Sequence, residues 1–190
     1  LAPAGSPESL RAAVQNGADA VYFGYGNYNA RRNAKNFSEQ EAAAAVSYCH
    51  LRGCKVNLTL NTLLTDRELA GAADLAAHAS SIGIDALIVQ DIGVMRMLRQ
   101  SAPDLPIHGS TQMSIHSLEG VLQAAELGCS RVVLARELNL QEVAEIRRKV
   151  SPELEIETFG HGAMCVSYSG RCLLSNYMTG RDSNRGACAQ

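Results

Sequence analysis

The sequence predicts an α/β fold, a (β/α)8 barrel of the TIM type with about seven βα units in its 190 residues. Helical stretches rich in Ala and Leu end repeatedly at a glycine, and an apolar, β-branched run begins soon afterwards. The glycines are Gly17, Gly53, Gly83 and Gly128. Glycine just past a helix closes the last turn in the left-handed conformation. The apolar runs do not alternate with polar residues, which is typical of parallel strands buried on both faces.

The predicted strands follow one another at regular intervals. Seven are expected, at residues 1–4, 20–23, 56–60, 86–89, 107–109, 132–134 and 154–159. A helix and short loops separate each strand from the next, and strict alternation of strands and helices indicates a parallel sheet.

The helix starts carry capping signals. Four polar residues are expected to cap helices: Ser6, Ser38, Asp66 and Asn139. Ser6 is followed by proline, which is favoured in a first helical turn. Ser38 and Glu41 have the spacing of a capping box. Asp66 and Asn139 would open the helices over 67–82 and 140–150.

An open, doubly wound sheet is the alternative to a barrel. No βα turn contains G-x-G-x-x-G, which disfavours a dinucleotide-binding sheet. A barrel of about 250 residues would need an eighth unit after Gln190, so the chain looks truncated at both ends. We therefore expect residues 1–190 to be the amino-terminal catalytic barrel domain of a longer chain, with a cysteine-rich segment over 157–190.

Composition excludes several classes of protein. Hydrophobic residues make up 46% of the chain and charged residues 19%, which is too apolar for a disordered protein. No apolar run approaches the roughly 18 residues that span a membrane. The net charge of −2 argues against a protein that is basic throughout, but a local basic patch for nucleic acid remains compatible with it. Six cysteines without a recognisable signal peptide favour a reducing, cytoplasmic setting.

Polar residues follow almost every predicted strand, at the end where a barrel builds its active site. We therefore predict a ligand pocket there. The candidates for catalysis are His161, Asp91, Glu137 and Arg136, and those for substrate binding are Asn29, Arg31, Arg32, Asn61, Gln90, Thr111, Gln112 and Arg185. Alternatives stay open, because a single Asp or Asn after a strand often only caps the next helix. Arg136 and Glu137 could pair with each other, and Arg31 and Arg32 could be a solvated pair.

The six cysteines divide into two groups. Cys49, Cys54 and Cys129 lie near helix ends at the opposite pole of the predicted barrel, where small buried apolar groups are expected. Cys165, Cys172 and Cys188 have the spacing C-x6-C-x15-C among glycines and serines. Thiolates at such spacing suit an iron–sulfur cluster or zinc, and a buried structural trio is the alternative.

The cysteine-rich segment carries a family resemblance. The pattern E-x-F-x-x-G-A-M-C-x4-G-x-C-x-L-S over 157–175 resembles the signature of the U32 peptidase, or collagenase-like, family. The stretches 1–8, 18–24 and 185–190 fit the same family, so the resemblance covers essentially the whole chain.

The resemblance implies one of two activities. The family name implies a protease. Other members are oxygen-independent hydroxylation factors that act on a tRNA uridine, a ribosomal RNA cytidine or a ubiquinone precursor, with prephenate as an apparent co-substrate for the RNA enzymes. In those members four cysteines hold a [4Fe–4S] cluster. Cys165, Cys172 and Cys188 match the first three, and the fourth would lie beyond Gln190.

The preferred hypothesis is therefore an iron–sulfur enzyme that hydroxylates RNA. Arginines 31, 32 and 185 would meet phosphates, Tyr25 or Tyr28 would stack on an extruded base, and the amides of the rim would orient a small anionic co-substrate. The alternative is a peptidase with Cys165 as nucleophile and His161 as base, because neither H-E-x-x-H nor G-x-S-x-G occurs. A third hypothesis is a subunit that lends its cluster to a partner. Association with a second copy or with another protein stays open, and no membrane partner is expected.

Overall fold

The computed structural model describes residues 1–30, 36–162 and 164–189. Seven parallel strands form one sheet in the order β1-β2-β3-β4-β5-β6-β7. The strands are β1 (Ala2–Pro3), β2 (Ala20–Phe23), β3 (Lys55–Leu60), β4 (Ala86–Val89), β5 (Ile107–Gly109), β6 (Cys129–Val133) and β7 (Glu155–Glu157). A doubly wound sheet would reverse its strand order at a switch point. Strictly sequential order is that of a barrel, which confirms the predicted fold class.

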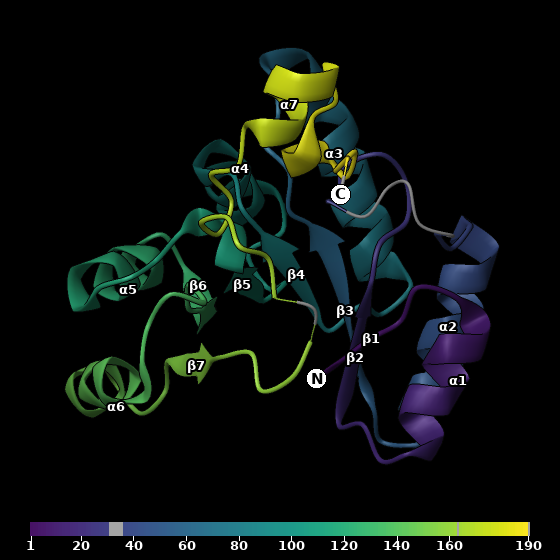
Figure 1. The fold of residues 1–190 in the computed structure, drawn as a ribbon. Coiled ribbons are helices and arrows are strands. Elements are labelled where there is room, and N and C mark those ends of the chain that lie inside the picture. The colour runs from purple at the N-terminus through teal and green to yellow at the C-terminus, as the bar shows by residue number, and fades with distance from the viewer. Residues whose placement is uncertain (31–35, 163, 190) are drawn as a thin grey trace.

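Helices connect the strands and cover the outside of the curled sheet (Figure 1). They are α1 (Pro7–Gln15), α2 (Glu39–His50), α3 (Asp66–Ser81), α4 (Ile92–Ser101), α5 (Leu118–Glu126) and α6 (Leu140–Lys149). After β7 the chain departs from this repeat. It crosses over the sheet as an extended segment with one short helix, α7 (Leu174–Thr179), and a 3-10 turn at Ser183–Arg185. Another 3-10 turn, at Thr111–Met113, follows β5.

Three of the four predicted caps are confirmed, and the fourth is wrong by one residue. Ser6, Ser38 and Asn139 each accept a backbone N–H of the following turn. Thr65, rather than Asp66, is the N-cap of α3. The reason is the glutamate three residues after Thr65: Glu68 Oε2 accepts the Thr65 N–H and its hydroxyl, both at 2.8 Å. A cap at Asp66 would place Leu69 at that position, where it could offer no acceptor.

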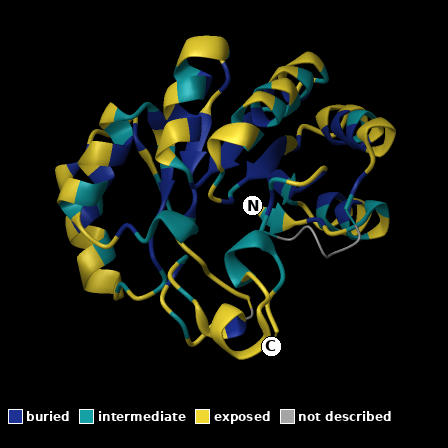
Figure 2. Cartoon of the chain, turned by 90° about the horizontal axis from the view of Figure 1, so that it is seen from above, coloured by how far each residue is buried: buried dark blue, intermediate teal, exposed yellow. Residues whose placement is uncertain are grey.

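The hydrophobic core lies between the sheet and its helices. Its largest fully buried side chains include Leu58, Leu60, Leu87, Met95 and Leu98. Figure 2 shows burial concentrated on the strands and on the inner faces of the surrounding helices, whereas α7 and the segment around it are mostly exposed. The segment after β7 contributes no residue to the main core cluster within the described ranges.

Cys49, Cys54 and Cys129 belong to the core, as predicted. They are 0%, 2% and 5% exposed. Burial raises the pKa of Cys49 to about 12 and that of Cys129 to about 11, so both remain neutral thiols at physiological pH. They serve packing rather than thiolate chemistry.

A buried histidine lies on β5, an interior strand of the sheet. His108 on β5 is 7% exposed and pairs in register with Ile88 on one side and Arg131 on the other. Burial, followed by the positive charge of Arg131, lowers the pKa of His108 to about 4. The imidazole is therefore uncharged at neutral pH.

The sheet has two edges, β1 and β7, which do not pair with each other in the described structure. The side of the barrel between these edges is open in Figure 1. Among the described residues, no helix combines the length and the apolar character that crossing a membrane requires.

Candidate functional site

A cavity of about 980 Å³ occupies the open side and the mouth of the barrel. Its walls come from β1, β2 and β7, from the residues after β5 and β6, and from the cysteine-rich segment. Thr111, Gln112, Arg136 and His161 line it, as do all three of the segment's cysteines. Residues that follow β5 and β6 and the three cysteines therefore line one cavity.

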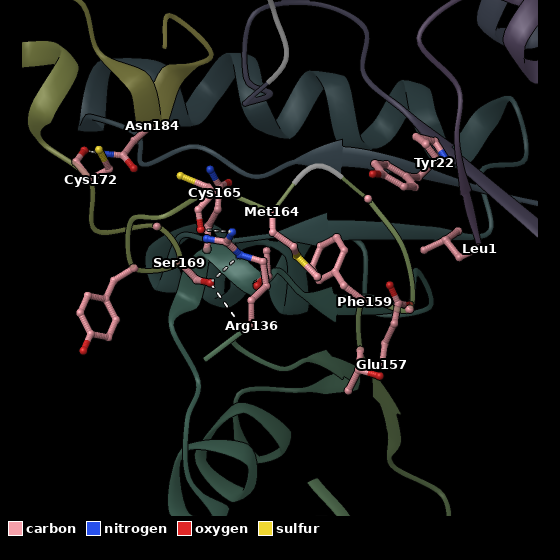
Figure 3. A pocket seen from close by; sticks show the side chains of 18 of the residues that line it. Leu1, Tyr22, Arg136, Glu157, Phe159, Met164, Cys165, Ser169, Cys172 and Asn184 are labelled. Carbon is pink, nitrogen blue, oxygen red and sulfur yellow. Dashed lines mark hydrogen bonds between the residues drawn. The ribbon is translucent and has the colours of Figure 1, made fainter. Parts of the chain in front are cut away.

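Arg136, just after β6, holds the backbone of the cysteine-rich segment. Its Nη1 donates to the Cys165 carbonyl at 3.0 Å and its Nη2 to the Ser167 carbonyl at 2.9 Å. Nε donates to the Ser169 hydroxyl at 3.2 Å. Figure 3 shows the guanidinium lying between the Cys165 and Ser169 parts of the segment. One side chain thus fixes three points along residues 165–169.

Glu137 holds the same segment from the next position. Its carboxylate accepts the Ser169 N–H at 2.9 Å and lies 3.5 Å from His116 Nε2. Desolvation raises the pKa of Glu137, but hydrogen bonds from Ser169 and the neighbouring backbone lower it by more, so the pKa lies below its ordinary value. No ion pair joins Arg136 to Glu137 in the part of the chain that is described. Each instead binds Ser169, which is 2% exposed.

A third contact docks the segment onto the turn after β5. Ser114, in the left-handed conformation with φ of 60°, donates its hydroxyl to the Ser169 carbonyl and accepts from Arg171 Nε at 3.1 Å. Gly170 lies directly against the backbone of Gln112, and a Cβ there would be 2.0 Å from the Gln112 carbonyl oxygen. Only glycine allows this approach.

Hydroxyl and amide donors surround the three sulfurs. The Ser167 N–H points to Cys165 Sγ and the Ser167 hydroxyl to Cys172 Sγ, both at 3.4 Å. The Ser175 hydroxyl lies 3.9 Å from Cys188 Sγ. The Ser167 hydroxyl, followed by a backbone N–H, holds the pKa of Cys172 below its ordinary value. The environment of Cys172 therefore favours the thiolate, which is the metal-binding form.

The sulfurs share a cavity but are not gathered into a preformed metal site. Among the described residues, no three of the His, Cys, Asp and Glu side chains are arranged to hold a metal ion. Cys165 and Cys188 are exposed, and Cys172 is half-buried. The donor chemistry and the common cavity fit a thiolate-bound group, and closer approach of the sulfurs would need movement of the segment.

Arg185 ties the end of the segment to α3. Its Nη1 and Nη2 bond to the two carboxylate oxygens of Glu68 at 2.7 and 2.8 Å, and Nη2 also donates to the Leu63 carbonyl. Hydrogen bonds from Arg185, and then from Thr65, hold the pKa of Glu68 far below its usual range. Arg185 was predicted to meet phosphate. In the structure its guanidinium positions the turn that precedes Cys188.

Several predicted rim residues make structural contacts. Asp91 caps α4 and accepts N–H groups with both oxygens, from Val94 and from Leu64, as the capping alternative expected. Asn61 Oδ1 accepts the Ala30 N–H at 3.1 Å, and the fully buried Asn29 donates to the Gly26 carbonyl.

Gln90 and Gln112 differ from Asp91, Asn61 and Asn29, because part of each amide group is left without a structural contact in the described part of the chain. Gln90 Nε2 donates to the Gln112 carbonyl at 3.3 Å. The buried Oε1 atoms of both glutamines have no hydrogen-bond partner among the residues that the structure describes. Thr111 donates to the Leu134 carbonyl. Of the rim amides that the structure describes, Gln112 both lines the cavity and offers an unused acceptor.

The stacking role suggested for two tyrosines is not supported at Tyr25. This side chain is 4% exposed, and burial raises its pKa to about 12. Tyr28 is half-buried, with its hydroxyl against Gly71. Arg31 and Arg32 lie outside the described residues. Sequence reasoning also missed Ser169, because a serine in a glycine- and serine-rich loop carries no local signal of its contacts.

Comparison with known proteins identifies a matching family and several relatives. Residues 5–190 match the family described as peptidase family U32. The chain is 43% identical over its whole length to a tRNA hydroxylation protein P1 of Bacillus subtilis and 42% identical to a 23S rRNA 5-hydroxycytidine synthase of Escherichia coli. It is 36% identical to a collagenase of Porphyromonas gingivalis. The chain covers 44%, 28% and 48% of these three relatives.

A solved U32 peptidase has the same fold. It superimposes with a TM-score of 0.69 over 83% of this chain and 66% of its own, at 20% identity. The family match spans nearly every residue, including the segment with the three cysteines. The chain therefore belongs to peptidase family U32.

Proposed function

We propose that this chain is the base-binding part of a U32-family protein that hydroxylates RNA. The observation that carries the proposal is the identity of about 40% over the entire chain to proteins named for hydroxylation of tRNA and of ribosomal RNA. The chain spans less than half the length of these relatives, so the activity belongs to the whole protein.

We propose further that Cys165, Cys172 and Cys188 hold a [4Fe–4S] cluster, with the fourth ligand outside the chain. Support comes from their common cavity, from the donors around each sulfur and from the lowered pKa of Cys172. When bound, the cluster would supply redox chemistry that side chains lack. Arg136, Glu137 and Arg185 would hold the ligating segment in place.

A small anionic co-substrate, such as prephenate, would bind in the same cavity. Gln112 is the proposed polar contact, because its Oε1 is buried without a partner in the described structure. The cavity of about 980 Å³ exceeds what a molecule of this size needs. This leaves room for a base beside it.

The test uses the full-length protein in a strain that lacks its gene. RNA nucleosides are measured by mass spectrometry after complementation with wild type, Cys172→Ala or Cys129→Ala. We expect a hydroxylated nucleoside to disappear on deletion and to return with wild type and Cys129→Ala, but not with Cys172→Ala. Cys129 is the matched control because it lies in the core. Unchanged RNA in the deletion strain would overturn the proposal.

Iron content gives an independent readout. Anaerobically purified wild type and Cys129→Ala should retain iron, and Cys165→Ala and Cys172→Ala should lose it. Equal loss in all three variants would contradict the division of the cysteines. Retained iron with RNA hydroxylation that depends on a second protein would identify a cluster-bearing partner subunit instead.

A peptidase is the second candidate, favoured by the collagenase relative and by one geometric observation: Cys165 and His161 line the same cavity. The described residues show no hydrogen bond between them, and Cys165 Sγ instead accepts the Ser167 N–H. Amide hydrolysis needs an activated nucleophile. Gelatin cleavage that wild type performs and Cys165→Ala does not would favour the peptidase.

A further inference from the structure

The cysteine-rich segment exposes an unusual number of large apolar side chains. They are Met164 (57% exposed), Val166 (91%), Tyr168 (67%), Leu173 (71%), Tyr177 (89%) and Met178 (69%). Exposed apolar side chains gathered in one region of a soluble protein mark an interaction site. We call Tyr168, Tyr177, Arg171 and Arg181 the mouth surface: all four are exposed residues of the segment that lines the cavity, and Tyr168 itself is one of the lining residues.

The charge of the segment is positive. Residues 158–189 contain three arginines and one aspartate, in a chain whose net charge is −2. Arg185 is ion-paired with Glu68. Arg171 and Arg181 are exposed and form no salt bridge within the described ranges. Among the described residues, their side chains bond only to the Ser114 hydroxyl and the Cys188 carbonyl, so their charges are available to an anionic partner.

Two tyrosines of the segment are exposed. Tyr168 lines the cavity, and its ring lies 6.2 Å from the ring of His116. Tyr177, on α7, is the more exposed of the two. Exposed aromatic rings and arginines without a salt bridge, on one segment, are the combination of groups that binds unpaired nucleotides, whose bases stack while their phosphates meet the cations.

We propose that the mouth surface binds a single-stranded loop of RNA, with bases stacked on Tyr168 and Tyr177 and phosphates near Arg171 and Arg181. The inference rests on the proposed function and names the residues that would recognise its substrate. Paired bases do not offer their faces, so a duplex would bind less well. The positive charge favours RNA over a second copy of a chain that is negative overall.

The test measures binding to the full-length protein by fluorescence anisotropy. The probes are a labelled single-stranded oligoribonucleotide of about 12 residues and a blunt duplex of equal length. Tyr177→Ala should weaken binding of the single strand about 5- to 150-fold. Tyr177→Phe should bind as wild type, and Tyr177→Leu should resemble Tyr177→Ala, because leucine is apolar but has no ring. Leu140→Ala is the control, since Leu140 is 87% exposed on α6.

The arginines are tested by salt dependence. Arg171→Gln and Arg181→Gln should each reduce the slope of log affinity against log salt concentration by about 0.7, the value for one phosphate contact on a single strand. An unchanged slope in both variants would contradict the proposed phosphate contacts.

Three outcomes would overturn the inference. Wild-type binding by Tyr177→Leu would exclude stacking. Unchanged RNA binding together with a changed sedimentation coefficient in Tyr177→Ala would assign the surface to a second copy. The third outcome is that the mouth-surface variants all bind RNA tightly and support RNA hydroxylation as wild type does. This would leave the proposed function intact and place RNA recognition elsewhere on the protein. Absence of any RNA binding by wild type would instead count against the proposed function itself.

Discussion

Replacing Gly170 by alanine should detach the cysteine-rich segment from the barrel while the barrel stays folded. The added Cβ would lie 2.0 Å from the Gln112 carbonyl oxygen, at a backbone φ of +72°. An ordinary carbon–oxygen contact is about 3.3–3.6 Å, so the segment must retreat by more than about 1 Å. The Ser169 N–H, 2.9 Å from Glu137, would then lose its hydrogen bond.

The expected loss of stability of the docked segment comes from the positive φ at position 170 and from the lost hydrogen bond. The left-handed conformation costs a residue with a Cβ about 1–2 kcal/mol, and a lost hydrogen bond to a charged group about 1.5–3 kcal/mol. Together they destabilise the docked segment by about 2.5–5 kcal/mol. The core cluster lies in the barrel and not in the described part of this segment. The cost should therefore appear as local opening and not as global unfolding.

Hydrogen exchange read by mass spectrometry separates local from global effects. Peptides from 158–189 should exchange faster in Gly170→Ala, and peptides from β3 and β4 should be unchanged. Gly160→Ala is the matched control, because a Cβ at Gly160 meets nothing within 4 Å. Wild-type protection of the segment in Gly170→Ala, or equal loss in Gly160→Ala, would refute this account of how the segment is docked.

Three further predictions concern single side chains. Arg136→Lys loses the two contacts that the guanidinium makes to carbonyl groups, so a thiol reagent should modify Cys165 several times faster than in wild type. An unchanged rate would contradict the role of Arg136 in holding the segment. His108, with its pKa lowered to about 4, binds a proton only in the unfolded state between about pH 4 and 6.5. Wild type should therefore lose about 2 kcal/mol more stability than His108→Gln between pH 7 and pH 5 in urea denaturation, and parallel pH profiles would contradict this. Glu68 has a lowered pKa, so the stability that it gives to the segment through Arg185 is present above the ordinary carboxyl pKa and is lost as the pH falls. At pH 7, Glu68→Gln should be cleaved near Arg185 faster than wild type. In wild type this cleavage should become faster as the pH is lowered, and in Glu68→Gln it should not.

The strands and helices could be predicted because their signals are local. A glycine closes the helix before β4, and Gly83 has the left-handed φ of +86° that this position requires. The apolar run over 86–89 is buried at every residue. The error at Asp66 has the same local origin: the prediction considered the first polar residue of the helix without asking which candidate had a glutamate three residues later.

The roles of the charged residues at the strand ends could not be predicted in this way. Arg136 and Ser169 are 33 positions apart, and Glu68 and Arg185 are 117 apart. Nothing near Arg136 in sequence distinguishes a residue that binds substrate from one that binds a loop carbonyl. The pattern indicates which residues follow the strands, but the partner of each side chain depends on tertiary structure.

The contacts that attach the cysteine-rich segment leave parts of it free to move, as the proposed cluster site would require. The described part of the segment is held by polar contacts at two places, by Arg136 and Glu137 at residues 165–169 and by Glu68 at Arg185, and it adds no residue to the core cluster. Polar ties at the surface allow local rearrangement at a lower free-energy cost than repacking a core would. Cys172 lies between these two anchors and Cys188 lies just beyond Arg185. We therefore propose that binding of a cluster would draw these sulfurs together within the cavity while the barrel and both anchors keep their positions.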